Sequence, residues 1–429
     1  MSLKKHIKVL LCILSFLSFN AYSATNLNDI NTDMVSLKKQ CGASENCAES
    51  FFELIPWIWN TRIPDSNNPL LVNIGPGTFR IANPDTGYGM LFCNSGGHVT
   101  FRGAGRSTTT IVGPGVIFPL DLLNESTVVK IKNCEQLSFE DMTIKADLFT
   151  DAAAYAVGWE GEGNSTWNNV ELIASYYPWV DKCSNSGTTS SHSWFSSTFT
   201  SNGTGVLNVA YRSDCGFSEI HGSNLIAIKS SVNSPWSLLG VEAGSKGQVA
   251  LYGSQVRVIV PADANSNVVY NNPEAPSGPS SVPSYGHGGL LALNGGIIHM
   301  HGGIISVRHE RNDVNSSVFG ARAIGSGSMV HTPDTAFGMK ASGTGVVERI
   351  MASDGGVVNA PFQWPAGSNP PDIISTDGSD TFVETDCNSS GQCTDVPANQ
   401  RQPHMMIYNS NCLPSTQWFD STMKLCRLN

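Results

Sequence analysis

Charged residues are scarce in this chain of 429 residues, because Asp, Glu, Lys and Arg together make up only 14% of it. Helical bundles carry many Lys and Glu side chains on their surfaces, so this scarcity, together with 42 glycines, disfavours a helical fold. No apolar run after the amino terminus reaches the roughly 18 residues that a membrane-spanning helix needs. No pair of cysteines has CxxC spacing, which argues against zinc. These absences predict a soluble protein that is not a helical bundle.

The first 23 residues have the three parts of a secretory signal peptide. Lys4, Lys5 and Lys8 form a basic segment, residues 9–19 an apolar core, and residues 21–23 a small-residue cleavage site. We therefore expect a secreted protein, either extracellular or periplasmic, with no membrane insertion. Without residues 1–23, the chain has 22 basic residues against 35 acidic ones. This acidic balance argues against nucleic acid or anionic lipid as a partner.

The cysteines support export. Eleven are present, and one of them, Cys12, falls within the signal peptide. The even set of ten that remains suits disulfide bonds in an oxidising compartment. The sequence leaves the connectivity open, but local pairing would join Cys41 to Cys47, Cys93 to Cys134, Cys183 to Cys215, Cys387 to Cys393 and Cys412 to Cys426.

A repeat of seven residues can be read directly between residues 290 and 310, as LLALNGG, IIHMHGG and IISVRHE. Each seven has apolar residues at its second and fourth positions and small or polar residues at its third and fifth, the pattern of a strand with one buried face. Three such strands, separated by corners, make one coil of a three-sided solenoid. The interior side chains predicted for this coil are Leu291, Leu293, Ile298, Met300, Ile305 and Val307, with His299, His301 and Arg308 outside.

The same frame recurs on both sides, for example in NVAYRSD (208–214), LLGVEAG (238–244) and FGARAIG (319–325). Residues 71–81 (LVNIGPGTFRI) resemble the opening strand of the pectin-lyase-like superfamily, and residues 98–113 and 128–144 are similar to its early coils. The resemblance implies an all-β, right-handed, three-sided parallel β-helix over residues 70–360. That superfamily includes lyases, hydrolases, esterases, phage spikes and adhesins, so the activity stays open.

Both ends of such a helix need a cover, because an open coil exposes unpaired strand edges. Residues 24–69 contain an amphipathic segment that we expect to form an N-terminal helical cap. Residues 361–429 are rich in proline and contain four cysteines, and they predict a disulfide-stapled C-terminal cap or a small module.

Three longer segments, 174–205, 261–288 and 309–317, follow the third strand of a coil, and we interpret them as insertions that wall the first-strand face. The first segment holds Tyr176, Trp179 and Trp194, whose rings either stack on sugars or pack the loop onto the helix. One polar column is expected beside this wall, and its members, coil by coil, are Glu160, Arg212, Glu242, Asn294 and Arg322. Asp214 lies two residues beyond Arg212 on the same face.

Two kinds of carbohydrate chemistry fit these side chains. Elimination on a uronan needs a base and a positive charge, which Arg212 or Arg322 would supply. Hydrolysis needs two carboxylates, for which Glu160 and Glu242 are candidates. We therefore expect a secreted enzyme that acts on a polysaccharide, with Asp214 as a further catalytic candidate. Tyr176, Trp179, Trp194 and Asn294 are the expected substrate contacts. The alternative is a non-catalytic surface β-helix that binds glycan or protein, in which the column is a salt-bridged ladder.

A second strand face carries His299 and His301, with His331 at the next coil. Two histidines at this spacing could share a metal, but no carboxylate falls in their column, so no metal is expected there. No motif supports Ca²⁺, and no cofactor is expected.

Overall fold

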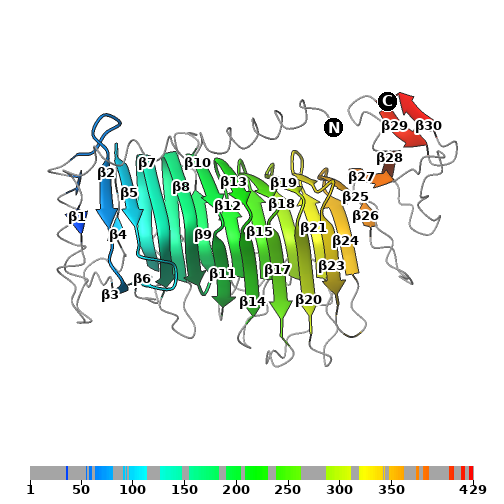
Figure 1. Cartoon of the computed structure of the whole chain (residues 1–429). Coiled ribbons are helices and arrows are strands. Elements are labelled where there is room, and N and C mark those ends of the chain that lie inside the picture. The colour runs from blue at the N-terminus through cyan, green and yellow to red at the C-terminus, as the bar shows by residue number, and fades with distance from the viewer. Residues whose placement is uncertain are drawn as a thin grey trace, which may run out of the picture.

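A computed structural model of the chain describes residues 63–80, 96–113, 126–146, 154–182, 190–203, 208–229, 238–261, 287–310, 318–341 and 347–361, with shorter stretches around them. Nearly all of these residues lie in strands that wind as a three-sided parallel β-helix (Figure 1). Each strand pairs in parallel with its equivalent in the next coil, so the coils stack in chain order. The predicted all-β parallel β-helix is confirmed.

Three sheets run the length of the stack. The first contains β4 (Met90–Leu91), the starts of β7 (Ser126–Ala146) and β8 (Ala154–Ala174), β9 (Tyr177–Lys182), β12 (Asn208–Ser213), β15 (Leu238–Gly244), β18 (His287–Leu293), β21 (Val318–Ile324), β24 (Val347–Ser353) and β26 (Ile373–Ser375). The second contains β1 (Val35–Ser36), β2 (Leu70–Asn73), β5 (His98–Arg102), the middles of β7 and β8, β10 (Ser190–Phe195), β13 (Phe217–His221), β16 (Gln248–Tyr252), β19 (Ile297–His301), β22 (Met329–His331), β25 (Val357–Pro361), β27 (Asp380–Thr385) and β28 (Met405–Asn409).

The third sheet contains β3 (Gly77–Arg80), β6 (Thr109–Gly113), the ends of β7 and β8, β11 (Thr198–Gly203), β14 (Asn224–Lys229), β17 (Gln255–Val260), β20 (Ile304–His309) and β23 (Ala336–Lys340). A separate antiparallel pair is formed by β29 (Gln417–Asp420) and β30 (Leu425–Leu428).

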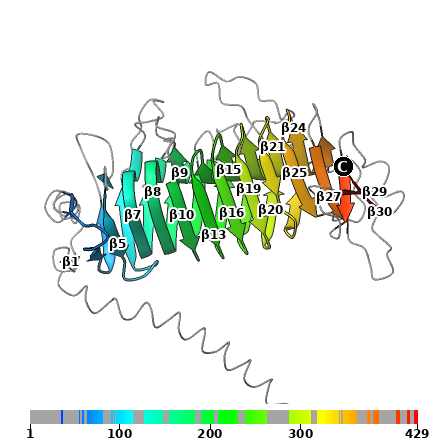
Figure 2. The same ribbon diagram turned by 90° about the horizontal axis from the view of Figure 1, so that it is seen from above.

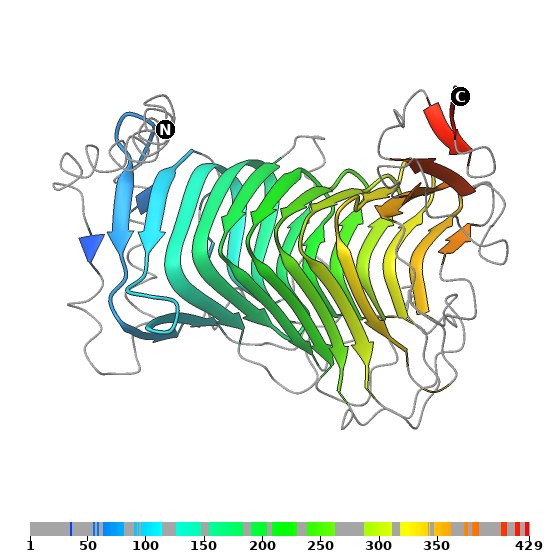
Figure 3. The same ribbon diagram turned by 45° about the vertical axis from the view of Figure 1, so that its right-hand side comes forward.

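Single residues with positive φ turn the chain from one side of the coil to the next. β7 and β8 are each 21 residues long and bend around all three sides, as Figure 3 shows for their part of the stack. Asn133 (φ 50°), Asp141 (φ 55°) and Asn169 (φ 53°) lie at these corners. Asn and Asp are the residues that tolerate the left-handed region best after glycine, so the corners are encoded locally.

The interior is filled by side chains that stack from coil to coil. Equivalent positions of the second sheet hold Phe101, Phe139, Trp167 and Trp194, whose neighbouring ring centroids lie 5.2, 4.2 and 4.6 Å apart. All four side chains are fully buried. Flat rings in register therefore bury a large apolar area and fix the strand alignment.

The repeat between residues 290 and 310 predicts two of its three strands correctly. Ile298, Met300, Ile305 and Val307 are buried in the interior, and His299, His301 and Arg308 point outward. In the first strand the prediction was wrong by one residue, because Leu290 and Ala292 face the interior. Leu291 and Leu293 are buried in a separate cluster on the outer face of the first sheet. This strand is apolar on both faces, so its alternation does not mark the inner one.

A second correction concerns residues 174–205, which were expected to be an insertion. Their described residues supply one strand to each of the three sheets: β9, β10 and β11 pair with β8 on one side and with β12, β13 and β14 on the other. The other two expected insertions, residues 261–288 and 309–317, fall almost wholly outside the described residues. So do the signal peptide and most of both expected caps.

The disulfide between Cys93 and Cys134 is confirmed. Cys215 is also disulfide-bonded, and its expected partner Cys183 lies outside the described residues. The side chains of Cys41, Cys47, Cys387, Cys393, Cys412 and Cys426 lie outside them too, so their pairing stays a prediction. Within the described part of the chain, no helix is both long enough and apolar enough to cross a bilayer.

Candidate functional site

The polar residues predicted on the first-strand face belong to one column only in part. Arg212 on β12 lies opposite Glu242 on β15. Leu291 on β18 holds the same place in the next coil, and Arg322 on β21 holds it in the coil after that. Three of the five expected members therefore share a column. Leu291 occupies the place expected for Asn294.

Arg212 connects the acidic groups of this face. Its Nε donates to both carboxylate oxygens of Asp214, at 3.2 and 3.1 Å, and its Nη1 donates to Tyr177 Oη at 2.9 Å. The same Nη1 lies 3.5 Å from Glu242 Oε1. Burial alone would lower the pKa of Arg212, but the charges of Glu242, Tyr177 and Asp214 hold that pKa well above its usual value. The guanidinium is therefore a permanent cation between two carboxyl groups.

The two carboxyl groups have different surroundings. Glu242 is only 3% exposed, and its Oε2 has no hydrogen-bond partner among the described residues. Burial raises the pKa of Glu242, Arg212 lowers it in part, and the charge of Asp214 raises it again. Asp214 is half-buried and ion-paired with Arg212. Burial thus favours the protonated form of Glu242, and Asp214 differs from it in being more exposed and bonded to Arg212 through both carboxylate oxygens.

Apolar side chains surround this polar group on the outer face of the sheet. The cluster consists of Tyr155, Tyr177, Val180, Val209, Leu239, Leu291, Leu293 and Phe319. Tyr177 stacks on Tyr155 with the ring centroids 5.2 Å apart. Water-poor surroundings of this kind strengthen the interaction between the cation and its carboxylates.

Arg322 forms a second charged group on the same face. It is 6% exposed and lies over the ring of Phe319, at 6.0 Å from the centroid. Burial raises the pKa of the neighbouring Glu348, and Arg322 opposes that effect. Glu348 and Tyr177 were not among the predicted site residues. Aligning residues 177–182 as a strand would have brought Tyr177 next to Arg212.

Glu160 does not join the Arg212 column. It lies on the outer face three coils before Glu242, across from Lys182. Its carboxylate pairs with Lys132 at 3.1 Å and Lys130 at 3.9 Å. The expected pairing of Glu160 with Glu242 is therefore wrong, since the coil 177–203 separates them further than expected. Asn294 is exposed at a corner with φ 51°, outside the strand.

The expected aromatic wall is also wrong. Trp179 and Trp194 are fully buried in the interior, so they pack the β-helix and do not face a ligand. Tyr176 is half-buried, with its ring 4.1 Å from that of Tyr177 and 5.5 Å from that of Tyr155. Of the expected substrate contacts in this segment, only Tyr176 lies beside the charged group.

The outer face of the second sheet carries a ladder of rings. Figure 2 shows its strands β10, β13, β16 and β19 following one another along the stack. The rings of Phe195, His221, Tyr252 and His301 stack in that order, with centroids 5.2, 4.8 and 5.7 Å apart. Their faces cover one another, so only the ring edges point outward, an arrangement poorly suited to stacking on sugars. Among the described residues, no group of three His, Cys, Asp or Glu side chains is arranged to hold a metal ion.

Known proteins resemble this chain in structure and not in sequence. The sequence matches no protein-family model and no curated protein. A Geobacillus virus E2 protein, ORF18, has a similar structure with a TM-score of 0.47 at 12% identity, covering 83% of this chain and 62% of that one. The pectin methylesterase PemA from Erwinia chrysanthemi gives 0.38 at 12% identity, covering 68% of this chain and 80% of its own. A GH87 α-1,3-glucanase from Streptomyces thermodiastaticus gives 0.27 at 9% identity, covering 81% and 68%.

Proposed function

We propose that this protein is a secreted enzyme that hydrolyses glycosidic bonds of a polysaccharide on the outer face of the first sheet. Glu242 is the general acid in this proposal, and Asp214 is the base or nucleophile. One observation carries it: a single guanidinium joins a buried carboxyl to a half-exposed, ion-paired one. Glycoside hydrolysis needs two carboxyl groups in different surroundings, one as the acid and the other as base or nucleophile.

The two carboxyls meet at one guanidinium. Glu242 lies opposite Arg212 on the next strand, and Asp214 lies two residues beyond Arg212. Asp214 Oδ2 is 3.1 Å from Nε of Arg212, and Glu242 Oε1 is 3.5 Å from its Nη1. A sugar bound over Arg212 would therefore lie beside both carboxyls, as glycoside hydrolysis requires. In the proposal Glu242, whose pKa burial raises, gives its proton to the glycosidic oxygen, and Asp214 acts on the sugar as base or nucleophile.

Elimination is less well supported than hydrolysis. That reaction needs a base that can lose its proton, but the carboxylates around Arg212 hold its pKa well above the usual value. Arg212 therefore stays protonated in any accessible pH range and cannot remove a proton. Its function in the proposal is to orient Asp214 and to balance the charge of the carboxylates.

Export is the second part of the proposal. It rests on the amino-terminal pattern of residues 1–23 and on the disulfide between Cys93 and Cys134. Disulfides persist in oxidising compartments and are rare in the cytosol. The polysaccharide would then be one that is met outside the cytoplasm.

The test is a panel of neutral and uronate-containing polysaccharides incubated with the mature protein. Reducing ends and the absorbance of unsaturated products are followed in parallel. The proposal expects new reducing ends without unsaturated products. Unsaturated products would show elimination instead. Binding to a polysaccharide of the panel without any product would favour the non-catalytic alternative.

A further inference from the structure

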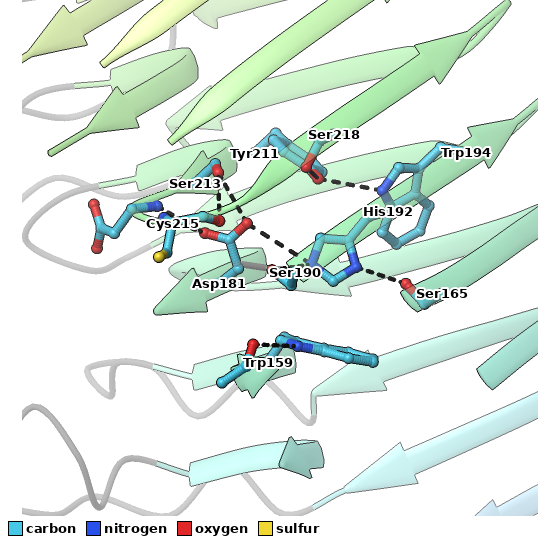
Figure 4. Close-up of polar contacts among 12 residues, drawn as sticks. Trp159, Ser165, Asp181, Ser190, His192, Trp194, Tyr211, Ser213, Cys215 and Ser218 are labelled. Atoms are coloured by element: carbon cyan, nitrogen blue, oxygen red, sulfur yellow. Dashed lines mark hydrogen bonds and ion pairs between the residues drawn. The ribbon is translucent and has the colours of Figure 1, made fainter. Parts of the chain in front are cut away.

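The interior of the β-helix contains a polar cluster directly beneath Arg212 and Asp214. Figure 4 shows its members, which come from β8, β9, β10 and β12. Every one of these side chains is at most 4% exposed: Ser165, Asp181, Ser190, His192 and Ser213. A buried acid among apolar rings is costly unless its hydrogen bonds are satisfied. The partners of Asp181 therefore indicate what the cluster holds in place.

Asp181 binds three consecutive residues of the following coil. Its Oδ1 accepts hydrogen bonds from the backbone N–H groups of Asp214, at 2.7 Å, and Cys215, at 3.0 Å. Its Oδ2 lies 2.8 Å from Ser213 Oγ. These three residues form the corner that follows β12. One carboxyl group from the preceding coil thus contacts every residue of the corner, which the backbone oxygen of Asp181 and the disulfide of Cys215 also hold.

That corner carries a residue of the proposed active site. Asp214 points outward from it and binds Nε of Arg212 through both carboxylate oxygens, and Arg212 in turn reaches Glu242. A continuous series of contacts therefore runs from the interior through the corner to the outer face. Asp181 itself is fully buried and cannot touch a substrate.

His192 completes the cluster on its inner side. Its Nδ1 lies 2.7 Å from Ser165 Oγ and its Nε2 lies 2.9 Å from Ser190 Oγ. Trp167 donates to the same Ser165 oxygen at 2.7 Å, which leaves the Ser165 hydroxyl free to donate to Nδ1. Ser165 thus satisfies the histidine but has no contact with residues 213–215. It offers a matched control for the loss of a buried hydrogen bond.

Titratable groups face Asp181 from three sides: His192 on β10, Tyr211 on β12 and Asp214 at the corner. Burial raises the pKa of Asp181 to about 8, opposed in part by the hydrogen bonds from the corner. Burial lowers the pKa of His192 to about 3. Near neutral pH both groups are uncharged, so their 3.9 Å approach is no ion pair. A neutral Asp181 can accept from the two N–H groups and donate to Ser213.

We propose that Asp181 is a positioning residue for the reaction: it holds the corner 213–215 so that Asp214 and Arg212 keep their places relative to Glu242. This inference rests on the proposed function. An amide in place of the carboxyl has the same shape and can make the same three hydrogen bonds. Removing the side chain takes the acceptor of the Cys215 N–H away, while the Asp214 N–H keeps only the backbone oxygen of Asp181, at 3.2 Å, and Ser213 Oγ keeps only that of Cys215, at 3.3 Å.

The experiment compares Asp181→Ala, Asp181→Asn and the control Ser165→Ala with wild type on the polysaccharide that the panel identifies. Asp181→Ala should lower kcat by about 10²-fold, the loss expected when a reacting group is displaced by about 1 Å, with little change in KM. Asp181→Asn should retain most of the wild-type kcat, and Ser165→Ala should retain kcat despite a similar loss of stability.

A second readout does not depend on activity. Hydrogen exchange, measured by mass spectrometry on a peptide that spans residues 213–216, should be faster in Asp181→Ala but unchanged in Asp181→Asn and Ser165→Ala. If Asp181→Ala does not fold, Asp181→Asn still decides, because an amide that keeps the hydrogen bonds should also keep kcat. A 10²-fold loss of kcat, or faster exchange at residues 213–216, in Asp181→Asn would overturn the inference.

Glu242→Gln separates the two levels of the argument. An inactive Glu242→Gln supports the proposed function. The positioning role of Asp181 nevertheless fails if folded Asp181→Ala keeps wild-type kcat, or if Ser165→Ala loses as much kcat as Asp181→Ala does. If Glu242→Gln keeps wild-type turnover, the proposed function fails. Unchanged exchange at residues 213–216 in Asp181→Ala would show in either case that Asp181 does not hold the corner.

Discussion

Replacing Asp181 by Asn should change how stability depends on pH. In the unfolded chain this carboxyl has its usual pKa of 3.8, whereas burial raises the pKa in the folded protein to about 8. Between pH 6.5 and about 8 the folded state therefore binds up to one proton more at this site than the unfolded state does. Stability falls as the pH rises through this window, and the contribution of the site is fully present only below 3.8.

The magnitude follows from the linkage of protons to folding. One extra bound proton corresponds to a slope of about 1.4 kcal/mol per pH unit, or about 2 kcal/mol between pH 6.5 and pH 8. His192 acts in the opposite direction, because burial lowers its pKa from 6.5 to about 3. Its contribution is present above 6.5 and is lost as the pH falls toward 3. The window from 6.5 to 8 therefore isolates Asp181.

The assay is guanidinium unfolding at both ends of this window, followed by the fluorescence of the buried tryptophans. Between pH 6.5 and pH 8 the wild type should lose about 2 kcal/mol more than Asp181→Asn, since the amide does not titrate. Ser165→Ala, which leaves Asp181 in place, should keep the wild-type slope. Equal slopes in wild type and Asp181→Asn would refute the reasoning, because the carboxyl would then be ionised in both states.

Three further predictions concern the scaffold. Trp194→Ala should lower the free energy of unfolding by about 3–5 kcal/mol, because the Trp194 ring is fully buried against Trp167. In the same denaturation assay, Phe195→Ala should lower it far less, because Phe195 is 40% exposed. Cys134→Ser should lower the free energy of unfolding by about 4 kcal/mol, since the disulfide to Cys93 closes a segment of 41 residues. Reductant should lower the melting temperature of wild type by breaking this disulfide, an effect that the variant cannot show. Gly163→Ala should destabilise much more than Gly222→Ala in thermal melts, because an added Cβ would lie 1.5 Å from the carbonyl oxygen of Cys134 in the first case and in open space in the second.

The alternation of apolar residues predicts the fold wherever one strand face is polar. Ile298 and Met300, and likewise Ile305 and Val307, alternate with polar or small residues, so their inward orientation follows from a period of two. β18 has apolar residues on both faces, and its alternation carries no such information. Its true start at His287 puts Leu291, and not Asn294, beside Glu242 and Arg322.

The coil 177–203 escaped prediction for a physical reason that also matters for the site. Its inward positions include Ser190, His192 and Asp181, which satisfy one another and the corner 213–215 through hydrogen bonds. A strand is identified by apolar residues at its inward positions. Where these positions are polar, that alternation is lost and the segment has the sequence pattern of a loop. Because the prediction omitted this coil, it placed Glu160 one coil too close to Glu242. It also assigned the two core tryptophans, Trp179 and Trp194, to a ligand-facing wall.

Parts of the charged group could be predicted nonetheless. Arg212, Glu242 and Arg322 interrupt otherwise apolar strands, and such interruptions recur at equivalent positions of the repeat. Asp214 follows from Arg212 at the end of the same strand. The burial of these side chains could not be predicted from the repeat. Glu242 and Arg322 are nearly inaccessible because an apolar cluster on the outer face of the first sheet surrounds them.

The central claim is that the outer face of the first sheet performs the chemistry, and the turnover of Glu242→Gln tests it most directly. The variant keeps the size of the side chain and removes the proton that a general acid supplies. Turnover should fall by about 10²–10⁴-fold, as is typical for the loss of a catalytic acid. His299→Ala, on the outer face of the second sheet, should leave turnover unchanged. With both variants melting like wild type, full turnover by Glu242→Gln would contradict the account.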